Sequence, residues 1–277
     1  APHVGWSLMR YALWKLRRGF ICHEFERRLI INKKIWVEPE QEHMIQRNLR
    51  LADVFGISNT PTVLDRPIFK EDPSSRIFAE QVLNESQNRL TVGLHLGSPE
   101  SRYNKLWDIN GWVKVCQMIY EKYTCRIVLV GGYAERGQAE LFVTRFQGTI
   151  INLVGICSNI METGEIIKRC HLFLGCDTGP TKLAMALGIP TATVWGPNSR
   201  SDNGAFWDLT IHADITLSFP CAPCAMMGLI TEGAGISNFS NCGHHNCLTL
   251  MTPEYVFEVI EQHHCVLLRK FTLQDAQ

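Results

Sequence analysis

The sequence has no excess of either charge, no long apolar run and no secretion signal. Its 27 lysine and arginine residues match 27 aspartate and glutamate residues, so the formal net charge at pH 7 is zero. A chain without an overall positive field has no electrostatic reason to bind nucleic acid, and we expect no such partner. No apolar run reaches the roughly 20 residues that a membrane-spanning helix needs. The signal-peptide pattern is also missing, so the sequence predicts neither a membrane span nor secretion.

Cysteine, by contrast, is plentiful: the 277-residue chain contains 11 cysteines. An odd number of cysteines without a secretion signal favours a reducing compartment, which predicts a cytoplasmic protein. The length allows one large domain or two modest ones. A composition with 45% hydrophobic and 19% charged residues is typical of a globular protein.

From Leu90 onward, strand-like and helical patterns alternate. Successive parallel strands must be joined by a crossover, which is usually a helix, so this order predicts an α/β fold with a parallel sheet covered on both faces. Ligands of such sheets bind beyond the carboxyl ends of the strands. The predicted strands are Leu90–His95, Arg126–Val130, Ile150–Val154, His171–Gly175 and Thr191–Trp195.

The segment Gly175–Pro190 carries the clearest functional signal. A strand-like run ends in Cys-Asp-Thr-Gly-Pro, and an apolar helix begins at once. The first N–H groups of a helix have no partner within it and carry partial positive charge, so such a turn suits a phosphate group. Gly179 permits close approach of a ligand, and Asp177 or Thr178 can cap the helix or reach a ligand hydroxyl. The alternative interpretation is a buried helix that is simply well capped.

A second turn of the same kind follows the first predicted strand. Ser98 and Ser101 supply hydroxyl groups there, and Arg102 and Lys105 supply positive charge. Two strand-to-helix turns, one basic and one with Asp-Thr-Gly, are typical of the two sides of a diphosphate site. For either basic residue alone, a solvated loop is the alternative interpretation.

Four motifs follow one another along the chain, at Gly97–Trp107, Val130–Glu135, Asn152–Gly155 and Asp177–Pro190, and a cysteine-rich segment at Cys221–Val256 closes the pattern. In this combination the sequence resembles glycosyltransferase family 9, the ADP-heptose:lipopolysaccharide heptosyltransferases. The combination is much more specific than any one of its parts.

The resemblance implies a GT-B-like fold, in which two Rossmann-like domains face each other. It assigns residues 1–73 to a partial N-terminal domain on the acceptor side and its linker, and residues 74–252 to a nucleotide-sugar-binding domain. Residues 253–277 would form a C-terminal helix that packs back on the first domain. The early strands of that domain, with the loop where the family usually keeps an aspartate as general base, have no counterpart here. We therefore expect either a fragment or a family member with a reduced first domain.

The family's reaction implies that this chain moves heptose from ADP-heptose to a lipopolysaccharide core acceptor, with inversion and without a metal. Lys105 and Asp177 would be the catalytic residues. The lysine would place a positive charge on the diphosphate, and the aspartate would contact the donor sugar or order its loop. The donor-binding residues that the resemblance implies are Ser98, Ser101, Arg102, Glu135, Thr178, Gly179 and Lys182.

Two of these residues, Glu135 and Lys182, have an alternative interpretation. The resemblance implies that Glu135 binds the nucleotide ribose, but an acid in the first turn of a helix also serves as a cap. Lys182 stands where the family usually has histidine, three residues after the glycine of Asp-Thr-Gly. A lysine there either adds charge near the phosphates or marks a different donor sugar.

The implied acceptor is a lipid-linked anionic glycan, which places the protein peripherally at the cytoplasmic face of an inner membrane. Residues 1–38 hold eight basic residues against three acidic ones, with aromatic residues interleaved. This composition suits a surface that meets anionic lipid or glycan, and equally an amphipathic helix packed on its own domain.

The cysteine-rich segment holds two pairs, Cys221 with Cys224 and Cys242 with Cys247. A Cys-x-x-Cys pair followed by a second pair resembles a structural zinc or iron site. Reduced thiols and disulfides are the alternatives. The transfer reaction itself requires no cofactor.

Two other functions fit the same motifs. One is a nucleotide-sugar epimerase with a GT-B-like fold, which would need no lipid acceptor. The other is a non-catalytic relative that binds a nucleotide sugar without turning it over.

Overall fold

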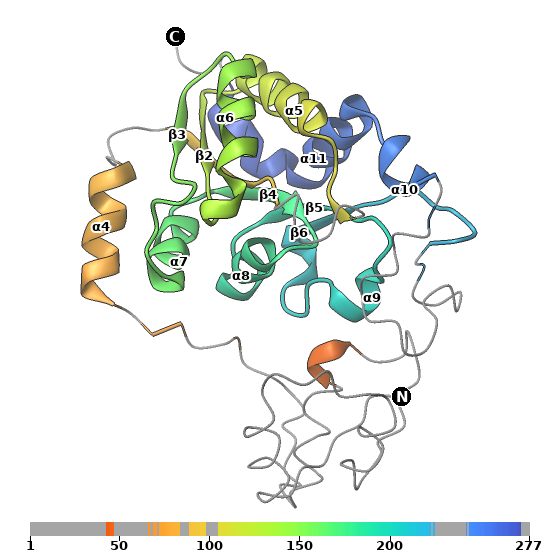
Figure 1. Cartoon of the computed structure of the whole chain (residues 1–277), viewed down its shortest axis with the longest axis horizontal. Coiled ribbons are helices and arrows are strands. Elements are labelled where there is room, and N and C mark those ends of the chain that lie inside the picture. The colour runs from red at the N-terminus through yellow and green to blue at the C-terminus, as the bar shows by residue number, and fades with distance from the viewer. Residues whose placement is uncertain are drawn as a thin grey trace, which may run out of the picture.

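A parallel sheet of six strands forms the centre of the molecule (Figure 1). The computed structural model describes residues 43–46, 66, 69–70, 72–83, 89–97, 105–222, 224, 242 and 244–272. The strands lie in the order β3-β2-β1-β4-β5-β6, and every neighbouring pair is parallel. Their bounds are β1 Leu90–His95, β2 Cys125–Leu129, β3 Ile150–Asn152, β4 Leu172–Cys176, β5 Thr191–Val194 and β6 His212–Ile215.

This sheet confirms the predicted α/β class. Strands β1 to β5 lie where the sequence pattern places them, with ends that differ by a residue or two. The pattern does not predict β6, because its four residues, His-Ala-Asp-Ile, include two polar ones. This strand forms at the edge of the sheet, where it pairs with β5 and where Trp195 Nε1 donates to Asp214 Oδ1 at 2.6 Å.

Helices cover both faces of the sheet, as Figure 1 shows. On one face, α5, α6 and α11 pack on the larger apolar cluster, which includes Trp112, Phe142 and Ile260. On the other face, α4, α7 and α8 pack on a second cluster around Phe173. The helices are α4 Pro73–Leu83, α5 Ile109–Lys122, α6 Arg136–Arg145, α7 Ile160–Lys168, α8 Gly179–Leu187, α9 Arg200–Asn203, α10 Asn246–Thr249 and α11 Pro253–Leu268, with short 3-10 turns η2 Tyr133–Glu135, η3 Leu209–Ile211 and η5 Arg269–Phe271.

Local sequence signals set the ends of the long helices. The side chain of Asn159 accepts hydrogen bonds from the backbone N–H groups of Met161 and Glu162 and so starts α7. Thr252 caps α11 in the same way, with proline at the first helical position. Helix α8 ends at Gly188, whose φ of 76° lies in the left-handed region that glycine adopts without strain.

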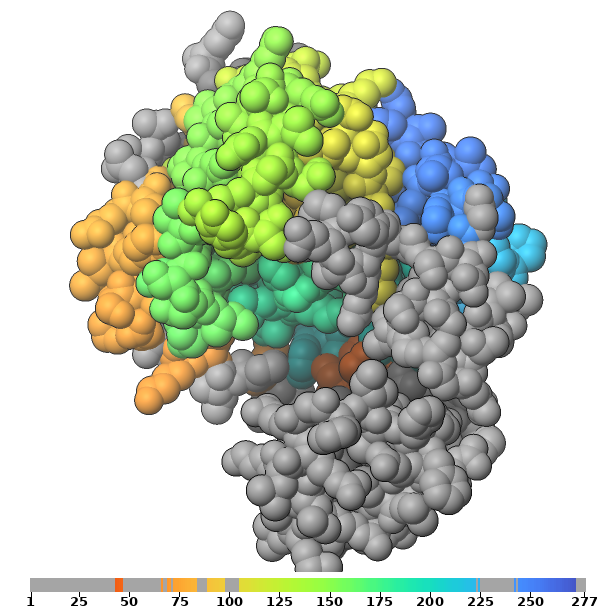
Figure 2. All heavy atoms as spheres, in the orientation of Figure 1, coloured from red at the N-terminus to blue at the C-terminus, as the bar shows by residue number. Residues whose placement is uncertain are grey.

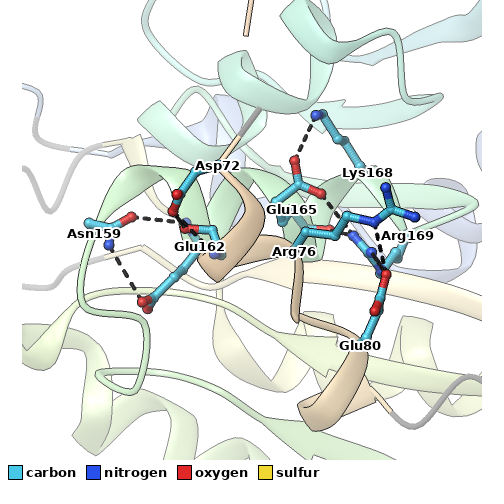
Figure 3. Close-up of polar contacts among 9 residues, drawn as sticks. Asp72, Arg76, Glu80, Asn159, Glu162, Glu165, Lys168 and Arg169 are labelled. Carbon is cyan, nitrogen blue, oxygen red and sulfur yellow. Dashed lines mark hydrogen bonds and ion pairs between the residues drawn. The ribbon is translucent and has the colours of Figure 1, made fainter. Parts of the chain in front are cut away.

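Helix α4 precedes the first strand, yet it belongs to the sheet domain. Figure 2 shows it on the outside of the domain beside α7. Its Ala79 and Leu83 are fully buried in the second apolar cluster. Figure 3 shows a polar network across the same contact, in which Arg169, the residue that follows α7, lies 3.2 Å from Glu80 of α4 and 2.9 Å from Glu165 of α7. The contact therefore combines apolar burial with paired charges.

Helix α11 packs on α5 and β6, where Val256, Ile260 and Leu268 are fully buried. The Lys122–Glu261 and Lys114–Glu254 ion pairs tie it to α5. Helix α11 thus packs on the sheet domain. The expected contact between residues 253–277 and a first domain stays a prediction. That domain, assigned to residues 1–73, falls almost wholly outside the described residues, as does the basic segment 1–38. None of the helices in the described part of the chain combines the length and apolar character needed to cross a membrane.

Candidate functional site

The strand order reverses between β1 and β4, and the candidate site lies at that point. Chain connections from β1 run to β2 on one side, and those from β4 run to β5 on the other. The loops that leave the carboxyl ends of β1 and β4 therefore diverge and open a crevice between them, which is where ligands bind in open α/β sheets. The two turns that the sequence predicts as sides of a diphosphate site are these two loops.

Trp107 anchors the loop after β1. Its backbone N–H donates to the Cys176 thiol at 3.3 Å, and its indole Nε1 donates to the Met251 carbonyl at 3.2 Å. The indole is nearly buried and meets Trp112 edge to face. Since Cys176 is the last residue of β4, the anchor holds the Lys105 segment against the Asp-Thr-Gly turn.

Asp177 is the centre of the site. Its Oδ2 atom accepts a hydrogen bond from Lys105 Nζ at 3.2 Å and another from the side-chain amide of Asn198. Its Oδ1 atom lies 2.7 Å from Lys182 Nζ. The Asp177 side chain is only 6% exposed, and that of Lys105 11%. Groups from the loops after β1, β4 and β5 and from the first turn of α8 thus meet at one carboxylate.

The charges of this cluster favour an anionic ligand. Two ammonium groups, those of Lys105 and Lys182, lie beside the one carboxylate of Asp177. Burial would raise the pKa of Asp177, but the cations and the hydrogen bonds that it receives outweigh burial, and its pKa lies below the usual 3.8. An ionised carboxylate held between these cations orders the loop, and its lowered pKa makes it a weak general base near pH 7.

Lys182 links the site to the segment after β5. Besides Asp177, its ammonium group donates to the Asn203 carbonyl at the end of α9 and lies 5.5 Å from the centre of the Trp195 ring. The Lys182 side chain is 41% exposed, so it can turn toward a ligand without displacing buried side chains. This position suits a second cation beside a phosphate.

A row of three polar side chains, those of His95, Thr178 and Thr181, lies next to the Asp-Thr-Gly turn. His95 ends β1, and its Nδ1 atom lies 2.9 Å from Thr178 Oγ1, which in turn lies 3.1 Å from Thr181 Oγ1. Burial lowers the pKa of His95 to about 4, so the imidazole is neutral at pH 7. Gly179 opens α8, and no atom of the described residues lies within 4 Å of the point where a side chain would begin.

Glu135 lies beyond the carboxyl end of β2, on the expected side of the sheet. Its carboxylate accepts a hydrogen bond from the Gly132 N–H, and the Glu135 N–H donates to the Gly132 carbonyl at 3.2 Å, so Glu135 caps the start of η2. The capping role is thus present, and the ribose contact stays a prediction.

Ser98, Ser101 and Arg102 lie outside the described residues. Sequence reasoning missed His95 and Asn198 as parts of the site. The signal for His95 is a polar residue at the last position of an otherwise apolar strand, directly before the glycine turn. Asn198 carries no comparable local signal, because its link to Asp177 spans 21 residues.

The four clustered cysteines are free thiols here. Burial and neighbouring thiols raise the pKa of Cys224, and they raise that of Cys247 to about 11. Cys242 accepts a hydrogen bond from the His245 N–H at 3.3 Å. Among the described residues, no three His, Cys, Asp or Glu side chains converge closely enough to hold a metal ion. The expected zinc or iron site stays a prediction.

Comparison with known proteins gives matches over most of the chain. A model of glycosyltransferase family 9 (heptosyltransferase) matches residues 8–232. A lipopolysaccharide heptosyltransferase 1 of Campylobacter coli is 25% identical over 138 residues, which are 47% of this chain and 38% of that protein. The chain spans less than half the length of the curated relatives that it matches.

Two solved structures share the fold. A glycosyl transferase family 9 protein of Veillonella parvula superposes with a TM-score of 0.68 at 17% identity, over 93% of this chain and 70% of that chain. The ADP-heptose lipopolysaccharide heptosyltransferase II of Escherichia coli superposes with a TM-score of 0.64 at 19% identity, over 88% of this chain and 68% of that chain. These likenesses support the GT-B-like fold that the sequence predicts.

Proposed function

Because the chain belongs to glycosyltransferase family 9, the heptosyltransferases, we propose that it binds ADP-heptose and transfers the heptose to a lipopolysaccharide core glycan. The observation that carries this proposal is the cluster of Lys105, Asp177 and Lys182 at the strand-order reversal. It offers positive charge and helix N–H groups at the place where a nucleotide diphosphate binds in such sheets.

In the proposed reaction, a hydroxyl oxygen of the acceptor attacks the anomeric carbon of the heptose. The bond from that carbon to the diphosphate oxygen breaks, and ADP leaves with the bonding electrons. Because the hydroxyl attacks from the face opposite to ADP, the configuration inverts. Negative charge grows on the leaving diphosphate. Lys105 and Lys182 would turn from Asp177 to this charge, together with the N–H groups of Thr178 and Gly179, and these groups make a metal unnecessary.

The acceptor hydroxyl also loses its proton, to a base or to solvent water. Asp177 is a poor candidate for this base, because its pKa is lowered. We assign its role to ordering the turn and contacting the donor sugar. Ser98, Ser101 and Arg102 would complete the phosphate site, and Glu135 would bind the ribose. The lipid-linked acceptor would hold the protein peripherally at the cytoplasmic face of an inner membrane.

A comparison of nucleotides by thermal unfolding tests the donor. ADP at 100 times its dissociation constant should stabilise the chain by about 2.7 kcal/mol. For a protein of this size, the melting temperature should rise by roughly 5–10 °C. UDP, GDP and CDP at equal concentration should give smaller shifts.

The pattern of melting temperatures decides which nucleotide, if any, binds at the site. A shift with ADP alone supports an adenine-nucleotide donor, and product formation from ADP-heptose and a core glycan is then measured. A larger shift with UDP, GDP or CDP would keep the site and overturn the donor. Equal melting temperatures with all four nucleotides and without them would overturn nucleotide binding at this site.

A further inference from the structure

Thr178 occupies the position before α8 where a threonine ordinarily caps a helix, yet its hydroxyl does not do so. Its φ of −132° and ψ of 165° are those of a normal N-cap residue, but its side chain makes no capping hydrogen bond. The usual target would be the N–H of Thr181, because Pro180, one residue nearer, has none. An available cap is thus left unused.

The Thr178 hydroxyl is turned toward the strands instead. It lies 2.9 Å from His95 Nδ1 and 3.1 Å from the Thr181 hydroxyl. His95 is 6% exposed and Thr181 is fully buried. A neutral imidazole offers one donor and one acceptor nitrogen, so His95 and Thr181 between them satisfy the Thr178 hydroxyl without the backbone.

The contact between the Thr178 and Thr181 hydroxyl groups depends on Gly175, which has no side chain. Gly175 of β4 pairs directly with His95 of β1. A Cβ atom at Gly175 would lie 2.5 Å from Thr181 Oγ1 and 3.4 Å from the His95 carbonyl oxygen. Only a residue without a side chain lets the Thr181 hydroxyl sit against the strand ends, where it meets Thr178.

We propose that His95 is a positioning residue that holds the Thr178 hydroxyl away from the start of α8, so that the first N–H groups of the helix stay open to the diphosphate of the donor. This inference rests on the proposed function. It gives the buried histidine a role in ligand affinity without contact with the ligand. The Thr178 hydroxyl would otherwise compete with a phosphate oxygen for the Thr181 N–H.

The test is a double-mutant experiment on the full 277-residue chain, with ADP binding measured by calorimetry. In His95→Leu the released Thr178 hydroxyl caps α8, so ADP affinity should fall by about fivefold, which corresponds to the ~1 kcal/mol of an N-cap hydrogen bond. The same His95→Leu change in a Thr178→Val background should have no effect, because no hydroxyl remains to form the cap. A purely structural histidine would weaken binding in both backgrounds.

Two further variants keep the inference falsifiable if His95→Leu folds poorly. His95→Asn places an amide oxygen near the position of Nδ1 and should retain ADP affinity within about twofold. Thr193→Val is the matched control, since it removes a buried hydroxyl on β5 that has no hydrogen-bond partner among the described residues. It should leave ADP affinity unchanged.

The outcomes separate this inference from the proposed function. If the unmodified chain binds none of the four nucleotides, the proposed function fails first. If it binds ADP and a folded His95→Leu variant binds ADP equally well, the role of His95 is wrong while the function stands. A fivefold or larger loss that persists in the Thr178→Val background also overturns the role of His95.

Discussion

Replacing Lys105 with alanine should lower kcat for heptose transfer by about 10²–10³-fold, the range seen when one group that stabilises developing charge is removed. The Lys105 ammonium lies 3.2 Å from Asp177 Oδ2 and its side chain is 11% exposed, so its charge acts in a sheltered place. Steady-state kinetics with ADP-heptose and a core glycan would measure the loss. Folding should be little affected, because Asp177 keeps Lys182 and Asn198 as partners.

Lys114→Ala provides the matched control for Lys105→Ala. Lys114 lies on α5, is 58% exposed and pairs with Glu254 of α11, far from the Asp-Thr-Gly turn in sequence. Its replacement should leave kcat within about twofold, since exposed ion pairs contribute little. Should Lys105→Ala turn over donor at the same rate as Lys114→Ala, the assignment of Lys105 to the leaving diphosphate would have to be abandoned.

Glu165→Gln should lower the free energy of unfolding by about 2–3 kcal/mol, near the lower end of what breaking a buried ion pair costs. Glu165 is 6% exposed and pairs with Lys168 at 2.7 Å and with Arg169 at 2.9 Å (Figure 3). The variant leaves both cations without this charge, although Lys168 keeps some contact with solvent. The melting temperature should fall by roughly 5–10 °C. Calorimetry or circular dichroism would measure it.

The ion pairs of Glu165 with Lys168 and Arg169 also make the free energy of unfolding depend on pH. Burial alone would raise the pKa of Glu165, but the hydrogen bonds from Lys168 and Arg169 outweigh it and hold the pKa below the usual 4.5. The charged form is therefore favoured in the folded state. The stability that it adds is present above pH 4.5 and is lost as the pH falls below that value. Glu165→Gln should match the unmodified chain at the acid end of the range.

Glu254→Gln is the control for Glu165→Gln, because it removes an ion-paired carboxylate that is 57% exposed. Its effect on the free energy of unfolding should stay within about 0.5 kcal/mol. Equal destabilisation by the two changes would show that burial does not set the strength of the α4–α7 network.

The alternation of strands and helices was predictable because each strand from β1 to β5 is a short run of mostly apolar or β-branched residues and the crossovers have helical periodicity. Strand β6 was not, since its polar residues are satisfied only by the finished fold: Asp214 accepts from Trp195, and His212 Nδ1 lies 3.0 Å from Thr191 Oγ1. The packing of α4 on the sheet domain could not be predicted either. Its ion pair between Glu80 and Arg169 joins residues that are far apart in the sequence.

For the site, the sequence predicts which two turns meet but not how their side chains pair. Lys105 and Asp177 each follow a strand that ends at the same edge of the sheet, and strand order alone brings them together. Lys182 and Asn198 reach the same carboxylate through contacts that no local pattern records. The hydrogen bond between His95 and Thr178 spans 83 residues, and the absence of a side chain at Gly175 leaves room for the Thr181 hydroxyl beside it.

Helix α4 is attached to the sheet domain ahead of the first strand. Asp72 caps this helix by accepting from the Ser74 hydroxyl at 2.8 Å and from the Ser75 N–H at 3.1 Å. Residues before Asp72 also contact the domain: Arg66 pairs with Asp208, and the Lys168 ammonium lies 4.8 Å from the centre of the Phe69 ring. A polypeptide trimmed to Leu90 would uncover the apolar cluster around Phe173 and Ile166 and would tend to aggregate.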